Sequence, residues 1–206
     1  AADGTRWGPF VAIVLTAAAP IASDLLRDLG RLESVADELA GIDYRTIYSA
    51  ALHYPIQIDR PYYALVNTDK SHDVGWVSRE ACKPGHVPAG ESVVIVQASH
   101  EWSVANAAES GSRRDMKLAA YVASLVGDDR LADPDWTDGR LWRSALPESS
   151  VSKEGVERAD RVGLFLAGDA VAGEGRIHAA LGSGLDAAER LVASDYNQPA
   201  SDVSDS

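Results

Sequence analysis

The feature that most constrains this chain lies near its C-terminal end, where an apolar run leads directly into a glycine-rich turn and then into a helical pattern. The apolar run, residues 162–167, predicts a buried strand, and residues 176–193 predict a helix. The turn between them carries Gly168, Asp169, Gly173 and Gly175. Glycine lets a backbone approach a ligand closely, and the first N–H groups of a helix lack partners inside it. The segment therefore predicts a site for an anion or an electron-rich ring.

The residue types in this turn suggest separate roles. Asp169 follows the strand end, where it can accept hydrogen bonds from sugar-like hydroxyls. The backbone of Gly175, Arg176 and Ile177 opens the helix and can hold a carbonyl oxygen that gains negative charge on reduction. The alternative is a plain strand–helix unit in which the glycines only make the turn.

The rest of the chain alternates between strand and helix patterns. An apolar run at 10–15 predicts a strand, and helical spacing of apolar residues predicts a helix over 21–39 with a break near Gly30. Four β-rich runs predict an antiparallel or mixed sheet, at 44–52, 62–67, 74–78 and 93–98. A further helix is predicted over 114–125, a loop over 128–139, a short extended segment over 141–146 and a frayed tail over 197–206. The chain is thus of the α/β (α+β) class.

Composition narrows the classes of function. The formal net charge of -12 disfavours nucleic acid as a partner, because phosphate contacts need a basic patch. Cys82 is the single cysteine, which excludes an intrachain disulfide and argues against a metal site. Residues 11–19 are apolar but too few to span a bilayer, and no signal peptide is recognisable. We therefore expect a cytoplasmic protein with no membrane partner. Its acidic, lysine-poor surface fits a halophilic source or an ordinary acidic protein equally well.

The string Leu-Ala-Gly-Asp-Ala-Val followed by Gly-x-Ile-x-x-Ala and Ser-Gly-Leu-x-Ala-Ala resembles the C-terminal flavin-binding segment of the FAD-dependent amine oxidases. The renalase-like NAD(P)/FAD-dependent branch is the most similar. Other matching stretches carry the resemblance through most of the chain, at 7–22, 75–85, 97–103 and 141–147. The run at 141–147 departs from the renalase pattern with Leu141 in place of Arg and Ser144 in place of Tyr.

The resemblance implies a cofactor and a division of the chain. It implies FAD held by Gly168, Asp169, Gly173, Gly175, Arg176 and Ile177, and a small-molecule substrate pocket that includes Trp142, Arg143 and His178. No catalytic side chain is assigned. Residues 1–22 would be a remaining strand and connector of the FAD domain, 23–150 a substrate-binding domain with a mixed sheet, 151–195 the C-terminal segment of a Rossmann-like FAD domain, and 196–206 a disordered tail.

The family's N-terminal G-x-G-x-x-G motif, which holds the FAD pyrophosphate, has no counterpart in this sequence. We therefore expect a C-terminal fragment, a truncated product or half of a split enzyme, which alone would bind FAD weakly. In the intact family, an amine or a reduced nicotinamide-like substrate gives a hydride to FAD. The alternative function is a non-catalytic module that pairs with a complementary FAD-binding chain, or with itself, through an apolar surface that the missing half would have covered.

Overall fold

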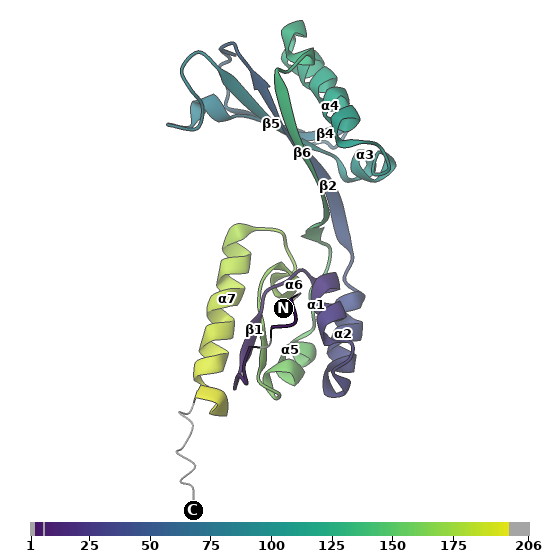
Figure 1. Cartoon of the computed structure of the whole chain (residues 1–206), viewed down its shortest axis with the longest axis vertical. Coiled ribbons are helices and arrows are strands. Elements are labelled where there is room, and N and C mark those ends of the chain that lie inside the picture. Colours follow the sequence, from purple (N-terminus) through teal and green to yellow (C-terminus); the bar gives the residue numbers. More distant parts are fainter. Residues whose placement is uncertain (1–2, 6, 198–206) are drawn as a thin grey trace, which may run out of the picture. The chain divides into compact units, whose positions relative to one another are not determined.

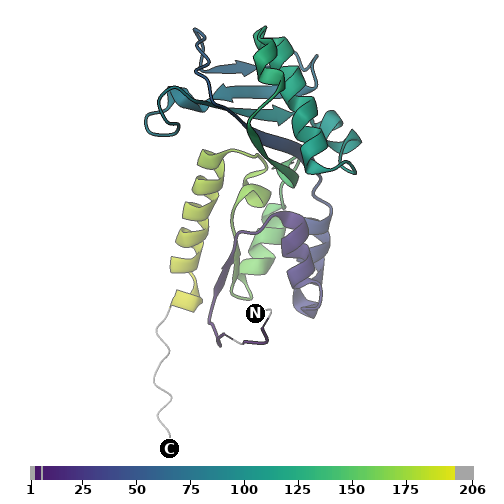
Figure 2. The ribbon, with the colours of Figure 1, turned by 45° about the horizontal axis from the view of Figure 1, so that its top comes forward.

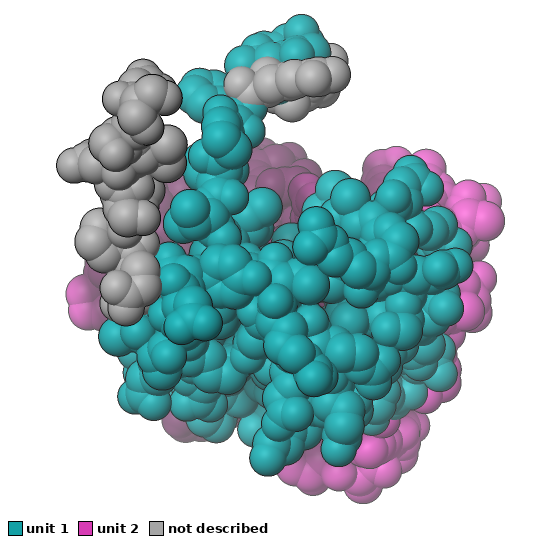
Figure 3. Space-filling model, turned by 90° about the horizontal axis from the view of Figure 1, so that it is seen from below, with its two compact units in different colours: residues 1–44, 146–206 teal, residues 45–145 magenta. Residues whose placement is uncertain are grey.

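The structure is a computed structural model that describes residues 3–5 and 7–197, and the chain divides into two compact units (Figures 1 and 3). Unit 1 consists of Ala1–Tyr44 and Leu146–Ser206, and unit 2 of Arg45–Ala145. These boundaries differ from those expected from the sequence, since residues 23–44 belong to unit 1. The functional assignment of each part stays a prediction. The expected tail lies outside the described residues from 198 onward.

Unit 1 is built on a parallel pair of short strands packed against helices. β1 (Ile13–Leu15) pairs with β7 (Leu164–Leu166), with Val14 opposite Phe165. The helices are α1 (Ala19–Leu26), α2 (Glu33–Ala40), α5 (Lys153–Asp160), α6 (Asp169–Ala172) and α7 (Ile177–Val192), with 3-10 turns η1 (Gly30–Leu32) and η4 (Asp195–Asn197). β7 is buried along its whole length, as the continuous apolar run predicted.

The single helix predicted over 21–39 is two helices that pack against each other. α1 ends at Leu26, and the chain turns through η1 before α2 begins at Glu33. Leu25, inside α1, and Leu29, between α1 and η1, do not enter the core and are 61% and 50% exposed. The break near Gly30 was predicted, whereas the exposure of these two leucines was not.

Unit 2 is a five-stranded antiparallel sheet with helices on one face (Figures 1 and 2). The strand order is β3-β4-β5-β2-β6. The strands are β2 (Tyr44–Tyr54), β3 (Ala64–Val66), β4 (Val74–Arg79), β5 (Ser92–Ala98) and β6 (Trp136–Pro147). The helical elements are η2 (Glu80–Cys82), α3 (His100–Ala105), α4 (Gly111–Val126) and η3 (Asp129–Ala132).

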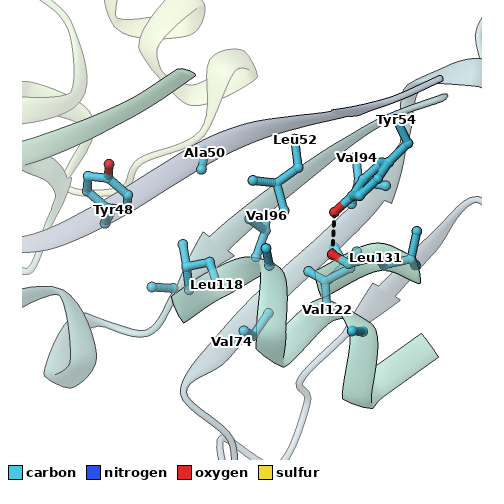
Figure 4. Packing of buried hydrophobic residues seen from close by; sticks show 14 of the residues in the cluster. Tyr48, Ala50, Leu52, Tyr54, Val74, Val94, Val96, Leu118, Val122 and Leu131 are labelled. Atoms are coloured by element: carbon cyan, nitrogen blue, oxygen red, sulfur yellow. Dashed lines mark hydrogen bonds between the residues drawn. The ribbon is translucent and has the colours of Figure 1, made fainter. Parts of the chain in front are cut away.

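The core of unit 2 lies between the sheet and α4 (Figure 4). Alternate residues of β2 and β5 point into it, and α4 contributes Leu118 and Val122, both completely buried. This alternation is the period-2 pattern that predicted the strands. It leaves the intervening residues of each strand on the opposite face of the sheet.

Four segments differ from the prediction. β6 is twelve residues long, pairs with β2 and includes the end of the predicted loop 128–139. The polar and glycine residues there are typical of a loop, which is why the strand was not predicted. Three short helices, α3, α5 and α6, were not predicted, because each has eight residues or fewer, too few for a helical repeat to be recognised. Within the described residues, no helix is long and apolar enough to cross a membrane. The fold confirms the α/β class.

Candidate functional site: the Gly-Asp turn and the open sheet face

The turn after β7 requires glycine at its first position. Gly168 has a φ of 102°, in the left-handed region that side chains rarely adopt, and an added Cβ would lie 3.3 Å from the carbonyl oxygen of Thr16. Its N–H donates to the hydroxyl of the buried Ser183 at 2.8 Å. The close approach of Gly168 to Thr16 brings together the residues that follow β1 and β7, and Ser183 fixes α7 against this point.

Asp169 is held by a side chain that is distant in sequence. The Tyr44 hydroxyl lies 3.2 Å from Asp169 Oδ1, to which it donates, and 3.2 Å from the Ala19 N–H, from which it accepts. Burial raises the pKa of Tyr44 above its usual value, and the neighbouring carboxylate adds to this rise. Tyr44 therefore donates to the Asp169 side chain as a neutral phenol.

The two later glycines allow close packing of the turn. Gly173 ends α6 with a φ of 71°, and a Cβ there would lie 3.1 Å from Cβ of Ser150. At Gly175 a Cβ would collide with the side chain of Leu146 and would lie 3.3 Å from its Cα. Larger residues at either position would displace the chain that leads into α7.

The start of α7 offers backbone donors. The Arg176 N–H donates to the Glu174 carbonyl at 2.9 Å, so this predicted contact group already has a partner in the protein. The N–H groups of Ile177, His178 and Ala179 open the helix, and among the described residues no protein acceptor is found for them. Arg176 is the N-cap residue, and its side chain accepts no capping hydrogen bond. This helix start can therefore donate to a ligand and place its positive dipole end beside it.

These features suit a flavin. A ring carbonyl can accept from the open N–H groups of α7, and Asp169 presents Oδ2, to which no side chain in the described residues donates. The glycines keep side chains out of the turn. Arg176 and His178 are exposed, and Ile177 is 91% exposed. In the described part of the chain, no cluster of His, Cys, Asp and Glu is arranged to hold a metal ion.

The apolar stripe on α7 faces outward. Ile177, Leu181 and Leu185 are 91%, 64% and 60% exposed. The helix instead packs through Ser183 and Ala187, both buried. Among the described residues, these three apolar side chains of α7 are therefore left largely exposed.

The predicted pocket residue Trp142 lies on the face of the unit 2 sheet opposite α4. It is 48% exposed, and the Arg140 guanidinium lies over its ring, 4.8 Å from the centroid. Arg143 follows directly, and neighbouring residues of a strand point to opposite faces. Its carbonyl accepts from the Thr46 hydroxyl at 3.2 Å, and its side chain is exposed. His178 lies in unit 1, so these three predicted residues are divided between the two units.

Three residues that contact predicted site residues were not among those predicted from the sequence. Tyr44 is 125 residues from Asp169, and no local pattern connects the two. Ser183 lies in the predicted helix, but nothing in the sequence indicated that its hydroxyl would bind the backbone of Gly168. Arg140 fell between the predicted loop and the predicted extended segment, although its i, i+2 spacing from Trp142 is the spacing of two residues on one face of a strand.

Comparisons with known proteins agree with this arrangement. The sequence model of the flavin-containing amine oxidoreductases matches residues 2–192. A protein from Exiguobacterium sp. 255-15 assigned as a protoporphyrinogen oxidase has a similar fold, with a TM-score of 0.62 and 17% identity, over 87% of this chain and 41% of that chain. Cyclohexylamine oxidase from Brevibacterium oxydans IH-35A gives 0.58 and 16%, over 87% and 42%. Wild-type putrescine oxidase bound to putrescine gives 0.57 and 16%, over 89% and 43%.

The chain therefore spans less than half the length of these structures, and identities this low show likeness of fold alone. The family match is different in kind, because it covers nearly the whole chain. Together with the Gly-Asp turn and the open start of α7, it leads to one conclusion: this protein belongs to the flavin-containing amine oxidoreductase family.

Proposed function

We propose that this chain forms the C-terminal part of an FAD-dependent oxidoreductase that oxidises an amine or a reduced nicotinamide-like substrate. The observation that carries the proposal is the turn at Gly168 and Asp169, followed by the uncapped start of α7. The chemistry that FAD supplies when bound is acceptance of a hydride from the substrate. Activity requires a complementary FAD-binding half, because the pyrophosphate-binding motif is not in this sequence.

In this proposal, the residues of this chain bind and orient the cofactor and the substrate. Asp169 accepts hydrogen bonds from hydroxyls of the ribityl region, and the N–H groups of Ile177, His178 and Ala179 hold a ring carbonyl. In unit 2, the exposed side of Trp142 provides an apolar wall for a substrate, and Arg140 stacks on that ring. The relatives act on amines according to their names, cyclohexylamine and putrescine, and we propose the same substrate class here.

Titration of FAD into the 15N-labelled chain tests the cofactor assignment. We expect amide shifts that saturate with FAD at Gly168 and at the first three residues of α7, even where binding is weak. The variant Gly168→Ala places a side chain at a φ of 102° and should weaken the response. Gly182→Ala is the matched control, since its Cβ would meet nothing within 4 Å. Shifts spread evenly over the surface, or none at these residues, would refute the assignment.

A second function is favoured by the outer surface of unit 1. β1 pairs only with β7 among the described strands, so its other edge is open, and Ile13 and Val14 are 53% and 47% exposed. Parallel sheets are normally larger and covered on both faces. The exposed stripe of α7 adds further apolar area. We propose that this surface pairs with a complementary FAD-binding chain or, failing that, with a second copy.

Light scattering of the purified protein, alone and with a candidate FAD-binding chain, tests this pairing. The variant Leu181→Asp places a charge on the stripe and should abolish association. Leu125→Asp is the control, because Leu125 is an exposed apolar residue of unit 2. Equal association by both variants would contradict pairing through α7.

A further inference from the structure

The hydroxyl of Tyr44 bridges two segments that meet at the Gly-Asp turn. It accepts from the Ala19 N–H at the start of α1 and donates to Asp169 Oδ1 at the start of α6, each at 3.2 Å. Tyr44 is half-buried, and all three residues belong to unit 1. The hydroxyl therefore ties the first turn of α1 to the carboxylate that follows β7.

The geometry fixes the direction of the hydroxyl proton. A phenol has one proton and can both donate and accept. Since its oxygen receives the Ala19 N–H, the proton is available to Asp169 alone. At the start of α1 the N-cap Ala18 has no capping side chain, and Pro20 has no N–H. Tyr44 thus serves as the cap of α1 while it holds Asp169.

We propose that Tyr44 is a positioning residue for the cofactor, an inference that rests on the function proposed above for Asp169. The bond to Oδ1 holds the Asp169 side chain in one orientation before a ligand arrives, and Oδ2 then accepts from a ribityl hydroxyl. Without the phenol hydroxyl, the carboxylate would have to be ordered during binding, at the expense of affinity. Tyr44 itself does not touch the reacting atoms.

The test is an FAD titration followed by the amide shifts of Gly168 and of the first turn of α7, in the wild type and in Tyr44→Phe. We expect the variant to bind FAD about tenfold more weakly, equivalent to about 1.4 kcal/mol. The matched control is Tyr121→Phe, which also removes a tyrosine-to-aspartate hydrogen bond, the 2.7 Å bond to Asp73 in unit 2. This control should bind FAD as the wild type does.

A double-mutant cycle with Asp169→Ala separates positioning from general stability, because alanine offers no acceptor to the Tyr44 hydroxyl. If Tyr44 acts through Asp169, adding Tyr44→Phe to Asp169→Ala should change the FAD affinity less than twofold. A further tenfold loss in that background would show that Tyr44 acts through overall stability, and would overturn the inference. Hydrogen exchange at the Ala19 amide, measured without FAD, should be about tenfold faster in Tyr44→Phe, and unchanged exchange would also overturn it.

The outcomes distinguish this inference from the proposed function. If the wild type shows saturable shifts at the start of α7 and Tyr44→Phe binds equally well, the positioning role of Tyr44 is wrong and the flavin site stands. If the wild type shows no such shifts while Ala19 exchange responds to the substitution, the hydrogen-bonded bridge exists but the flavin assignment fails, and the cofactor role of Tyr44 fails with it.

Discussion

Two tyrosines of β2 allow a comparison of a charged and a neutral hydrogen-bond acceptor in one core. Tyr48 and Tyr54 are 0% and 1% exposed and point to the same face of the sheet (Figure 4). The Tyr48 hydroxyl donates to the carboxylate of the buried Asp115 at 2.7 Å. The Tyr54 hydroxyl donates to the Leu131 carbonyl at 2.8 Å. A phenylalanine at either position keeps the ring and removes only the hydroxyl.

The expected losses follow from the acceptor. A hydrogen bond to a charged group contributes about 2 kcal/mol and one between neutral groups about 1 kcal/mol. Removing the Tyr48 hydroxyl also leaves Asp115, which is 4% exposed, with one side-chain donor among the described residues, the Thr137 hydroxyl at 2.7 Å. We therefore expect Tyr48→Phe to lower the free energy of unfolding by about 2 kcal/mol and Tyr54→Phe by about 1 kcal/mol.

Urea unfolding monitored by tryptophan fluorescence measures both variants. Four of the five tryptophans, at 76, 102, 136 and 142, lie in unit 2, so the signal reports mainly on that unit. An unchanged slope of free energy against urea would confirm that only stability differs. Equal losses in the two variants, or a larger loss in Tyr54→Phe, would refute the argument that the charge of the acceptor sets the difference.

Three further predictions concern the described residues. Gly139→Ala should cost about 3 kcal/mol in urea unfolding, because its Cβ would collide with the Tyr48 hydroxyl, whereas Gly75→Ala, with no contact closer than 3.7 Å, should cost far less. Burial raises the pKa of Tyr48 to about 12. Folding therefore favours the neutral form of Tyr48. This preference contributes fully to the free energy of unfolding below pH 10, and the contribution declines as the pH rises to 12. Between pH 10 and 12, the free energy of unfolding of the wild type should fall about 2 kcal/mol more than that of Tyr48→Phe. Ser183→Ala removes the acceptor of the Gly168 N–H and should lower the free energy of unfolding by about 1–2 kcal/mol, together with faster hydrogen exchange at that amide; unchanged exchange would contradict the assigned contact.

Much of the local structure around the candidate site could be predicted, because the signals for it are local. The apolar run before Gly168, the glycines at their turn positions and the small residues of α7 lie within about two dozen neighbouring residues. Their conformational preferences are properties of the residues themselves. The same reasoning identified β2, β4, β5 and α4, whose apolar periodicity is strong.

Other parts of the site depend on contacts between distant residues. Nothing near Asp169 in the sequence points to Tyr44. Arg140 lies between the predicted loop and the predicted extended segment, so only the structure places it on the same strand as Trp142. The helices α5 and α6 are too short for a helical repeat to identify them; the Ser152 side chain caps the start of α5, and Gly173 in the left-handed region ends α6.

The sequence by itself determined that residues 162–193 form a strand, a glycine turn and a helix with an apolar stripe, since backbone freedom and residue periodicity are encoded locally. Only the tertiary structure decided which side of that helix is buried. α7 packs through Ser183 and Ala187, while Leu181 and Leu185 face outward. The physical reason is that the spacing of apolar residues shows which of them share one side of a helix. Whether that side is buried depends on which neighbouring elements cover it.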